Sequence, residues 1–163
     1  MNSMITVAAM LALLGAGVIG GVFFAFSSFV MKALARVPSS AGIAAMQSIN
    51  VVVINPAFIG AFIGTALLSL AVIMLVLLSR THPATVWFLA GAVFYSAGTF
   101  LVTVFGNVPL NDHLAAVSAT DPAAVKFWGK YVDRWTMWNH IRTAAAIFAA
   151  VLFGVGLMQT GGM

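Results

Sequence analysis

The chain lacks cysteine altogether, its three acidic residues are all aspartate, and only seven of its 163 residues are lysine or arginine. Without cysteine it can form no disulfide, no iron–sulfur cluster and no thiolate metal site. Charged side chains make up 6% of the chain, against about 25% in ordinary soluble domains. Together with a mean hydropathy of +1.11, this scarcity excludes an ordinary soluble globular domain.

Long runs without any charge take the place of the missing charged residues. Residues 4–31 and 37–79 contain none, and each run exceeds the roughly 20 residues that cross a bilayer. We predict an all-α polytopic membrane protein that forms a single four-helix transmembrane domain over residues 1–163. Its spans are expected at about 4–34, 56–79, 84–105 and 135–158, and they would pack as an up-down bundle.

The connections between spans carry their own signals. Residues 41–54 read as an uncharged helix that either lies in the membrane interface or dips into the bundle. Residues 80–83 (Arg-Thr-His-Pro) read as a tight turn, and residues 123–134 as an amphipathic helix that continues into the fourth span. We therefore expect short interfacial helices in the 1–2 and 3–4 connections.

The basic residues favour one orientation in the membrane. Six of the seven cations fall on the side of the 1–2 and 3–4 connections: Lys32, Arg36, Lys126, Lys130, Arg134 and Arg142. By the positive-inside rule this side is cytoplasmic and both termini lie outside, with the cytoplasmic membrane as the expected location. Topology thus explains the basic charge without nucleic acid. The glycines of the first span are compatible with a homo-oligomer in the bilayer.

A polar stretch, Tyr131–Thr143, opens the last apolar segment. Helical spacing places Trp135, Trp138, Asn139 and Arg142 on one face, with His140 about 100° away from Asn139. Arg142 would lie about two turns inside an apolar helix, where a cation normally has an assigned partner or ligand. The alternative is an interfacial aromatic belt with an arginine that reaches out to the headgroups.

Other polar residues are expected at the same level of the bundle: Asn50, Asn55, Asn107, Asn111 and His113. Each has a structural interpretation, since Asn55 can cap a helix, Asn107 and Asn111 can shape a turn, and His113 can be solvated. Amides and imidazoles inside a membrane bundle are costly unless they bond one another or a ligand. Their convergence predicts a pocket.

Two kinds of chemistry are open to such a pocket. His113 and His140 could hold haem or copper, with methionines as further soft ligands. Otherwise no metal site is expected, and a neutral histidine could accept a proton while arginine and asparagine stabilise an oxyanion. Trp135 and Trp138 could stack on a flat aromatic ligand taken up from the lipid.

Several motifs resemble one known family. They are Phe-Ser-Ser-Phe-Val-Met at 26–31, Met-Gln-Ser-Ile-Asn at 46–50, Asn-Pro at 55–56, Asn-Val-Pro-Leu-Asn-Asp at 107–112 and Trp-Thr-Met-Trp-Asn-His-Ile-Arg-Thr at 135–143. Together they resemble the anthrone oxygenase-like family of small four-helix membrane proteins, long catalogued as a domain of unknown function, and the resemblance covers nearly the whole chain. Some fungal members oxidise an anthrone to an anthraquinone with molecular oxygen and no identified cofactor.

The resemblance implies a cofactor-independent monooxygenase acting on an electron-rich aromatic. In that reading His140 is the base, Arg142 and Asn139 stabilise the enolate oxygen, and His113 is the fallback base. Asn50, Asn55, Asn107, Asn111, Trp135 and Trp138 would complete the substrate pocket. Two other classes stay open: a membrane subunit that binds haem, copper, quinone or another hydrophobic ligand without turnover, and a structural membrane partner.

Overall fold

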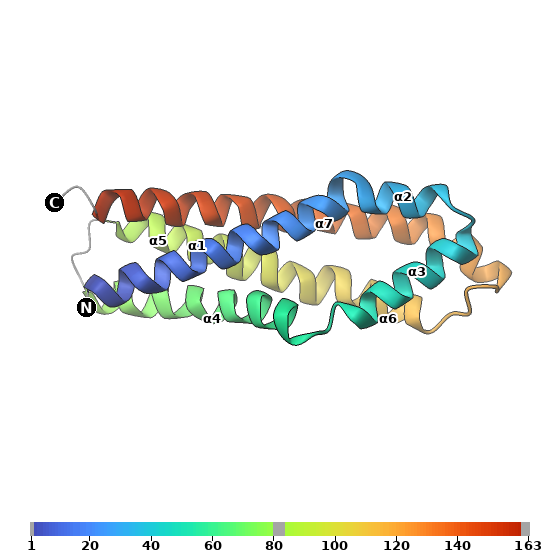
Figure 1. Cartoon of the computed structure of the whole chain (residues 1–163), viewed down its shortest axis with the longest axis horizontal. Coiled ribbons are helices and arrows are strands. Elements are labelled where there is room, and N and C mark those ends of the chain that lie inside the picture. Colours follow the sequence, from blue (N-terminus) through green and yellow to red (C-terminus); the bar gives the residue numbers. More distant parts are fainter. Residues whose placement is uncertain (1, 80–83, 161–163) are drawn as a thin grey trace.

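The computed structural model describes residues 2–79 and 84–160, and within them it is all-helical. Four long helices run side by side as an up-down bundle, and the described part of the chain starts and finishes at the same end of it (Figure 1). Four helices are long and apolar enough to cross a membrane: Ser3–Arg36, Pro56–Ser79, Thr85–Ala115 and Pro122–Thr160. The predicted fold class is confirmed, and the chain is a multi-pass membrane protein.

The elements follow one another in this order: α1 (Asn2–Ala25), η1 (Phe26–Val30), α2 (Met31–Arg36), α3 (Ser39–Val52), α4 (Pro56–Ser79), α5 (Thr85–Val93), η2 (Phe94–Leu101), η3 (Thr103–Asn107), α6 (Val108–Ala115) and α7 (Pro122–Thr160). The η elements are π-helical turns inside longer helices. The turn predicted at residues 80–83 lies outside the described residues.

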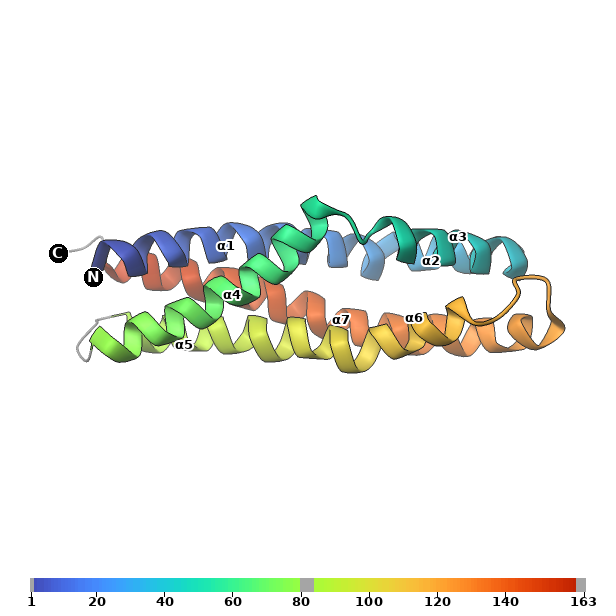
Figure 2. The same cartoon turned by 90° about the horizontal axis from the view of Figure 1, so that it is seen from below.

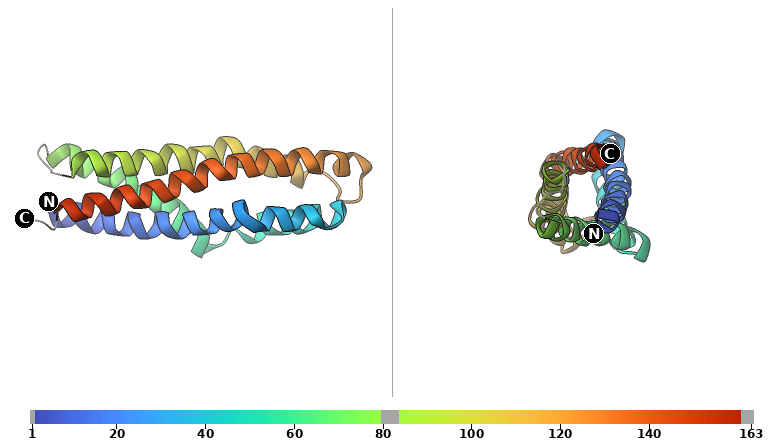
Figure 3. Two further views of the ribbon diagram at one scale, coloured as in Figure 1. Left: turned by 90° about the horizontal axis from the view of Figure 1, so that it is seen from above. Right: turned by 90° about the vertical axis from the view of Figure 1, so that its left-hand side faces the viewer.

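The bundle has two cores, one at each end. At the end with the termini, small residues of α1 and α7 let these helices approach α4 and α5 around Phe62, Phe88 and Phe153. At the other end α2, α3, α6 and the first half of α7 enclose a second core that contains Met46, Trp128 and other large side chains. Figures 2 and 3 show α4 crossing obliquely and α3 continuing its wall of the bundle.

The α3 helix is part of the bundle and runs beside its other helices (Figure 1). A side chain at Gly42 would meet the Trp128 ring at 2.8 Å, so glycine allows α3 to approach α7 closely. Gln47 donates to the carbonyls of Leu114 and Val117 at 2.8 and 2.9 Å, which caps the end of α6. Since α4 is only about 36 Å long, α3 supplies the fourth wall where α4 is absent.

The third long helix continues ten residues beyond the expected end of its span, to Ala115. The sequence signal for a break was Pro109, whose nitrogen cannot donate to the preceding turn. In the structure the π-helical turn η3 directly precedes α6, and η2 lies one residue before η3; these wider turns allow α6 to follow without a break. The amphipathic helix at residues 123–134 does run into the fourth span, as predicted, because α7 is one helix of 39 residues.

Candidate functional site

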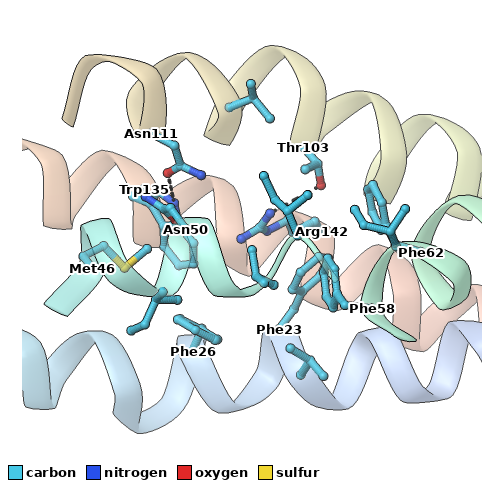
Figure 4. Close-up of a pocket in the computed structure, with 16 residues that line it drawn as sticks. Phe23, Phe26, Met46, Asn50, Phe58, Phe62, Thr103, Asn111, Trp135 and Arg142 are labelled. Carbon is cyan, nitrogen blue, oxygen red and sulfur yellow. Dashed lines mark hydrogen bonds between the residues drawn. The ribbon is translucent and has the colours of Figure 1, made fainter. Parts of the chain in front are cut away.

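A cavity of about 240 Å³ lies at the junction of the two cores, where the chain passes from α3 to α4. Its wall is mostly apolar, and its aromatic members are Phe23, Phe26, Phe58, Phe62 and Trp135. Four polar side chains also line it: Asn50, Thr103, Asn111 and Arg142. Figure 4 shows Arg142 reaching into the middle, with Asn111 and Trp135 on one side and Phe58 and Phe62 on the other. A lining of this composition suits a compact, largely apolar ligand that carries a few polar atoms.

Among the residues that the structure describes, Arg142 is the only charged one in the lining, and it is 5% exposed. Its guanidinium carbon lies 3.9 Å from the centroid of the Phe23 ring and 4.7 Å from that of Trp135. Its Nε donates to Asn139 Oδ1 at 2.8 Å, and one terminal nitrogen makes a long contact of 3.4 Å with Thr103 Oγ1. In the part of the chain described, no carboxylate neutralises it. Such a cation is costly to bury and is suited to binding an anionic oxygen.

A polar network fixes Asn139, the residue that orients Arg142. The Asn139 amide nitrogen donates to the Phe23 carbonyl and to Ser27 Oγ, each at 2.7 Å. Ser27 lies in the π-helical turn η1, and its hydroxyl also contacts Thr143 Oγ1 at 3.1 Å. Because both amide donors are used, Asn139 must turn its oxygen towards Arg142 Nε. This network holds the guanidinium against the cavity.

Asn111 is held in the same way at the other side of the cavity. Its Oδ1 accepts from the Tyr131 hydroxyl and from the Trp135 indole nitrogen, each at 2.9 Å. Those two donors lie on α7, whereas Asn111 lies on α6. The Trp135 ring thereby becomes a fixed wall between Asn111 and Arg142.

The cavity opens between the α3–α4 connection and α6. Ile54, in that connection, and Val108, at the start of α6, are 72% and 39% exposed, and both line the cavity. The opening therefore lies beside the first turns of α4, at one end of a helix whose length matches the bilayer. An apolar ligand could enter from the lipid at this level.

Three of the predicted site residues serve the fold and do not line the cavity. Asn55 accepts from the Phe58 backbone nitrogen at 3.0 Å and caps α4. Asn107, fully buried, donates to the Trp135 carbonyl at 3.1 Å. Trp138 packs its indole on Gly106, where any side chain would meet the ring at 2.8 Å. These three residues hold the surrounding helices in place and do not themselves line the cavity.

Neither predicted histidine lines the cavity. The exposed His140 bonds Ser27 Oγ through Nδ1 at 3.0 Å, and it borders a shallow groove with Lys32 and Asp133 on the far side of α7. His113 is also exposed and stacks on Phe127, with ring centroids 4.3 Å apart. His140 could therefore not take a proton directly from a ligand in this cavity, and it reaches Arg142 only through Ser27 and Asn139.

The same geometry corrects the alternative of haem or copper held jointly by His113 and His140. The positions of Phe127, which stacks on His113, and of His140 are about 20 Å apart along α7. Two histidines that share one metal must each lie about 2 Å from it. Among the described residues no group of three or more histidine, aspartate or glutamate side chains could hold a metal ion either.

Sequence reasoning missed most of the apolar wall and the helper residues Ser27 and Thr103. A signal was present, because Phe23 and Phe26, like Phe58 and Phe62, are spaced to share one face of a helix. In a chain this apolar, however, such pairs are indistinguishable from side chains that face lipid. Of the predicted residues, the structure brings Asn50, Asn111, Trp135 and Arg142 to the cavity, with Asn139 directly behind.

The family model described as anthrone oxygenase matches residues 54–152, more than half of the chain. The chain belongs to the anthrone oxygenase family. The matched region runs from the α3–α4 connection into the second half of α7, so this family segment contains Arg142, Asn111 and Trp135. No curated protein and no solved structure matches this chain.

Proposed function

We propose that this anthrone oxygenase family protein is a cofactor-independent monooxygenase that oxidises an anthrone-type aromatic with O₂ inside the bundle. The observation that carries the proposal is the buried Arg142 guanidinium, held by Asn139 and facing an aromatic cavity whose described lining residues carry no other charge. A site of this kind favours a flat aromatic whose oxygen becomes anionic during the reaction.

The size and chemistry of the cavity support this substrate class. At about 240 Å³ it lies just below the roughly 300–1,000 Å³ typical of drug-sized ligand sites, which favours a compact ring system. Phe23, Phe58 and Phe62 offer ring faces and edges to the ligand. An opening beside Ile54 lets the substrate arrive from the bilayer, where an uncharged tricyclic compound would concentrate.

The reaction balances without an added reductant. The CH₂ carbon of the anthrone loses a proton and the ketone becomes an enolate, whose oxygen lies against Arg142. The enolate gives one electron to O₂, the two radicals combine at that carbon, and the resulting peroxide anion takes up a proton to form a hydroperoxide. Loss of the second C–H proton with cleavage of the O–O bond leaves a new carbonyl and releases water. The ring carbon is oxidised, and O₂ supplies one oxygen to the product and one to water.

Arg142 carries the main electrostatic role in this scheme. A guanidinium removed from water stabilises an enolate strongly, so a weaker base is sufficient to remove the anthrone proton. Asn139 orients the guanidinium, and Trp135 and Phe23 hold it in plane by stacking on it. The initial proton passes to water at the opening, and His140 tunes the site only through Ser27 and Asn139.

We further propose that the protein lies in the cytoplasmic membrane with the α3 end of the bundle facing the cytoplasm and both termini outside. The basic residues of the 1–2 and 3–4 connections support this orientation. Its partners are then the aromatic substrate, O₂ and the surrounding lipid, with no nucleic acid, and the small-residue faces would allow a homo-oligomer.

The test is oxygen-isotope incorporation by protein purified in mild detergent, after its absorption spectrum and metal content have been recorded. Anthrone supplied with ¹⁸O₂ should give anthraquinone that carries one ¹⁸O, whereas ¹⁸O-labelled water should leave the fresh product unlabelled. A Soret band, stoichiometric copper or label derived from water would overturn the proposal. Ligand binding without any turnover would favour the non-catalytic binding role.

A further inference from the structure

The Asn111 amide has only one orientation that satisfies its neighbours. The Trp135 indole nitrogen can only donate, so the atom that it meets at 2.9 Å must be the amide oxygen. The Tyr131 hydroxyl donates to the same oxygen at 2.9 Å, which occupies both of its lone pairs. The amide nitrogen must therefore point the other way.

That nitrogen is a donor facing open space. The Asn111 amide nitrogen donates to no residue in the described part of the chain. It is nevertheless not one of the buried atoms that lack a partner. The buried side-chain atoms without a partner among the described residues are Ser96 Oγ, Asn107 Oδ1 and Thr136 Oγ1. The open space beside Asn111 is the cavity that it lines, and Figure 4 shows its amide at the rim next to Trp135.

A second set of unused donors belongs to Arg142. Its Nε donates to Asn139, but among the described residues its terminal nitrogens have only the long contact with Thr103 Oγ1. Asn111 meets the edge of the Trp135 ring at its indole nitrogen, whereas the Arg142 guanidinium lies over the face of the same ring, 4.7 Å from its centroid. Besides the side chains of Asn50 and Thr103, the cavity thus presents a cationic donor at Arg142 and a neutral amide donor at Asn111.

We propose that Asn111 is a second oxygen-binding donor, and that the site selects flat tricyclic aromatics with oxygen acceptors on two different edges. This rests on the proposed function and extends it. The substrate's own carbonyl oxygen lies at Arg142, and the oxygen that O₂ adds to the opposite carbon is received by Asn111 Nδ2. Asn111 thereby orients the reacting carbon and stabilises the hydroperoxide and quinone oxygen as they form.

Binding without oxygen tests this assignment apart from turnover. Anthracene, anthrone and 9,10-anthraquinone carry zero, one and two oxygens on the same ring system. Their dissociation constants would be measured anaerobically by quenching of tryptophan fluorescence in the intact, detergent-solubilised protein. For the wild type we expect anthraquinone to bind about three- to tenfold more tightly than anthrone, the gain from one neutral hydrogen bond.

Two variants of Asn111 and one control distinguish the role of the Asn111 amide nitrogen from that of the residues that bond the Asn111 oxygen. Asn111→Leu should abolish the gain from the second oxygen, and Asn111→Asp, which keeps acceptors for Tyr131 and Trp135, should reverse it. Tyr131→Phe removes one bond to the Asn111 oxygen but leaves the nitrogen in place, so it should retain the preference.

The outcomes also separate this proposal from the oxygenase itself. Equal binding of anthrone and anthraquinone by the wild type, or a preference unchanged in both Asn111 variants, would overturn the role of Asn111 even if turnover is found. A preference that follows Asn111, in a protein that consumes no oxygen, would retain the donor and refute the oxygenase.

Discussion

Replacing Arg142 by methionine should separate stability from function. Arg142 is 5% exposed, donates to Asn139 Oδ1 at 2.8 Å and stacks between Phe23 and Trp135. Loss of the charged hydrogen bond, with Asn139 Oδ1 left unpaired, costs about 1.5–3 kcal/mol. The two cation–π contacts add about 1–4 kcal/mol. Against this, removing a buried charge without a carboxylate partner recovers several kcal/mol of desolvation free energy.

These terms nearly cancel, so we expect the free energy of unfolding of Arg142→Met to change by less than about 2 kcal/mol. That corresponds to a shift of roughly 4–8 °C or less in the midpoint of thermal unfolding in detergent. The same substitution removes the donor for the enolate oxygen, so kcat/KM for anthrone oxidation should fall about 10²–10³-fold. Arg142→Lys keeps the charge but loses the fork that Asn139 orients, and should give an intermediate loss.

Two results would contradict this role of Arg142. A large loss of stability in Arg142→Met would mean that the cation serves mainly to stabilise the fold. Full activity in a folded Arg142→Met protein would mean that the guanidinium does not act on the reaction. Only a folded and inactive variant agrees with the geometry.

Three further predictions follow from the packing and topology. Gly106→Ala should lower the unfolding temperature, because its methyl group would meet the Trp138 ring at 2.8 Å, whereas Gly64→Ala, with nothing within 4 Å, should be neutral or slightly stabilising. His140→Ala should reduce kcat/KM less than tenfold, since His140 lies outside the cavity; a loss as large as that of Arg142→Met would restore it as the base. Because the chain has no native cysteine, single cysteines at the exposed positions Thr120 and Gln159 can report topology, and an impermeant thiol reagent applied to cells should label only Gln159→Cys.

Composition alone was sufficient to predict the fold. Uncharged runs such as residues 37–79 leave few alternatives to membrane spans, and the up-down arrangement follows from short connections. Helix ends were harder, because Pro109 normally marks a break, and no local signal reveals that π-helical turns before it will accommodate the ring. The placement of α3 depended on a contact between Gly42 and Trp128, which are distant in sequence.

The candidate site was predictable in part, for the same reason. Periodicity along α7 grouped Trp135, Trp138, Asn139 and Arg142 on one face and set His140 apart, because those relations lie within one helix, but of the four Trp138 packs on Gly106 and does not line the cavity. It could not distinguish Asn111, which lines the cavity, from Asn107, which bonds a backbone carbonyl, because that depends on the rotation of one helix against another. The phenylalanine wall was hidden for a related reason, since apolar side chains in a membrane protein can face either lipid or a ligand.

The most direct measurement is the stoichiometry of oxygen uptake and quinone formation by purified, metal-free protein, wild type against Arg142→Met. Our account predicts one O₂ consumed for each anthraquinone formed by the wild type, at a rate proportional to protein concentration, and a rate near that of the uncatalysed reaction for the variant. Equal rates for the two proteins, or oxidation no faster than in protein-free detergent, would contradict it.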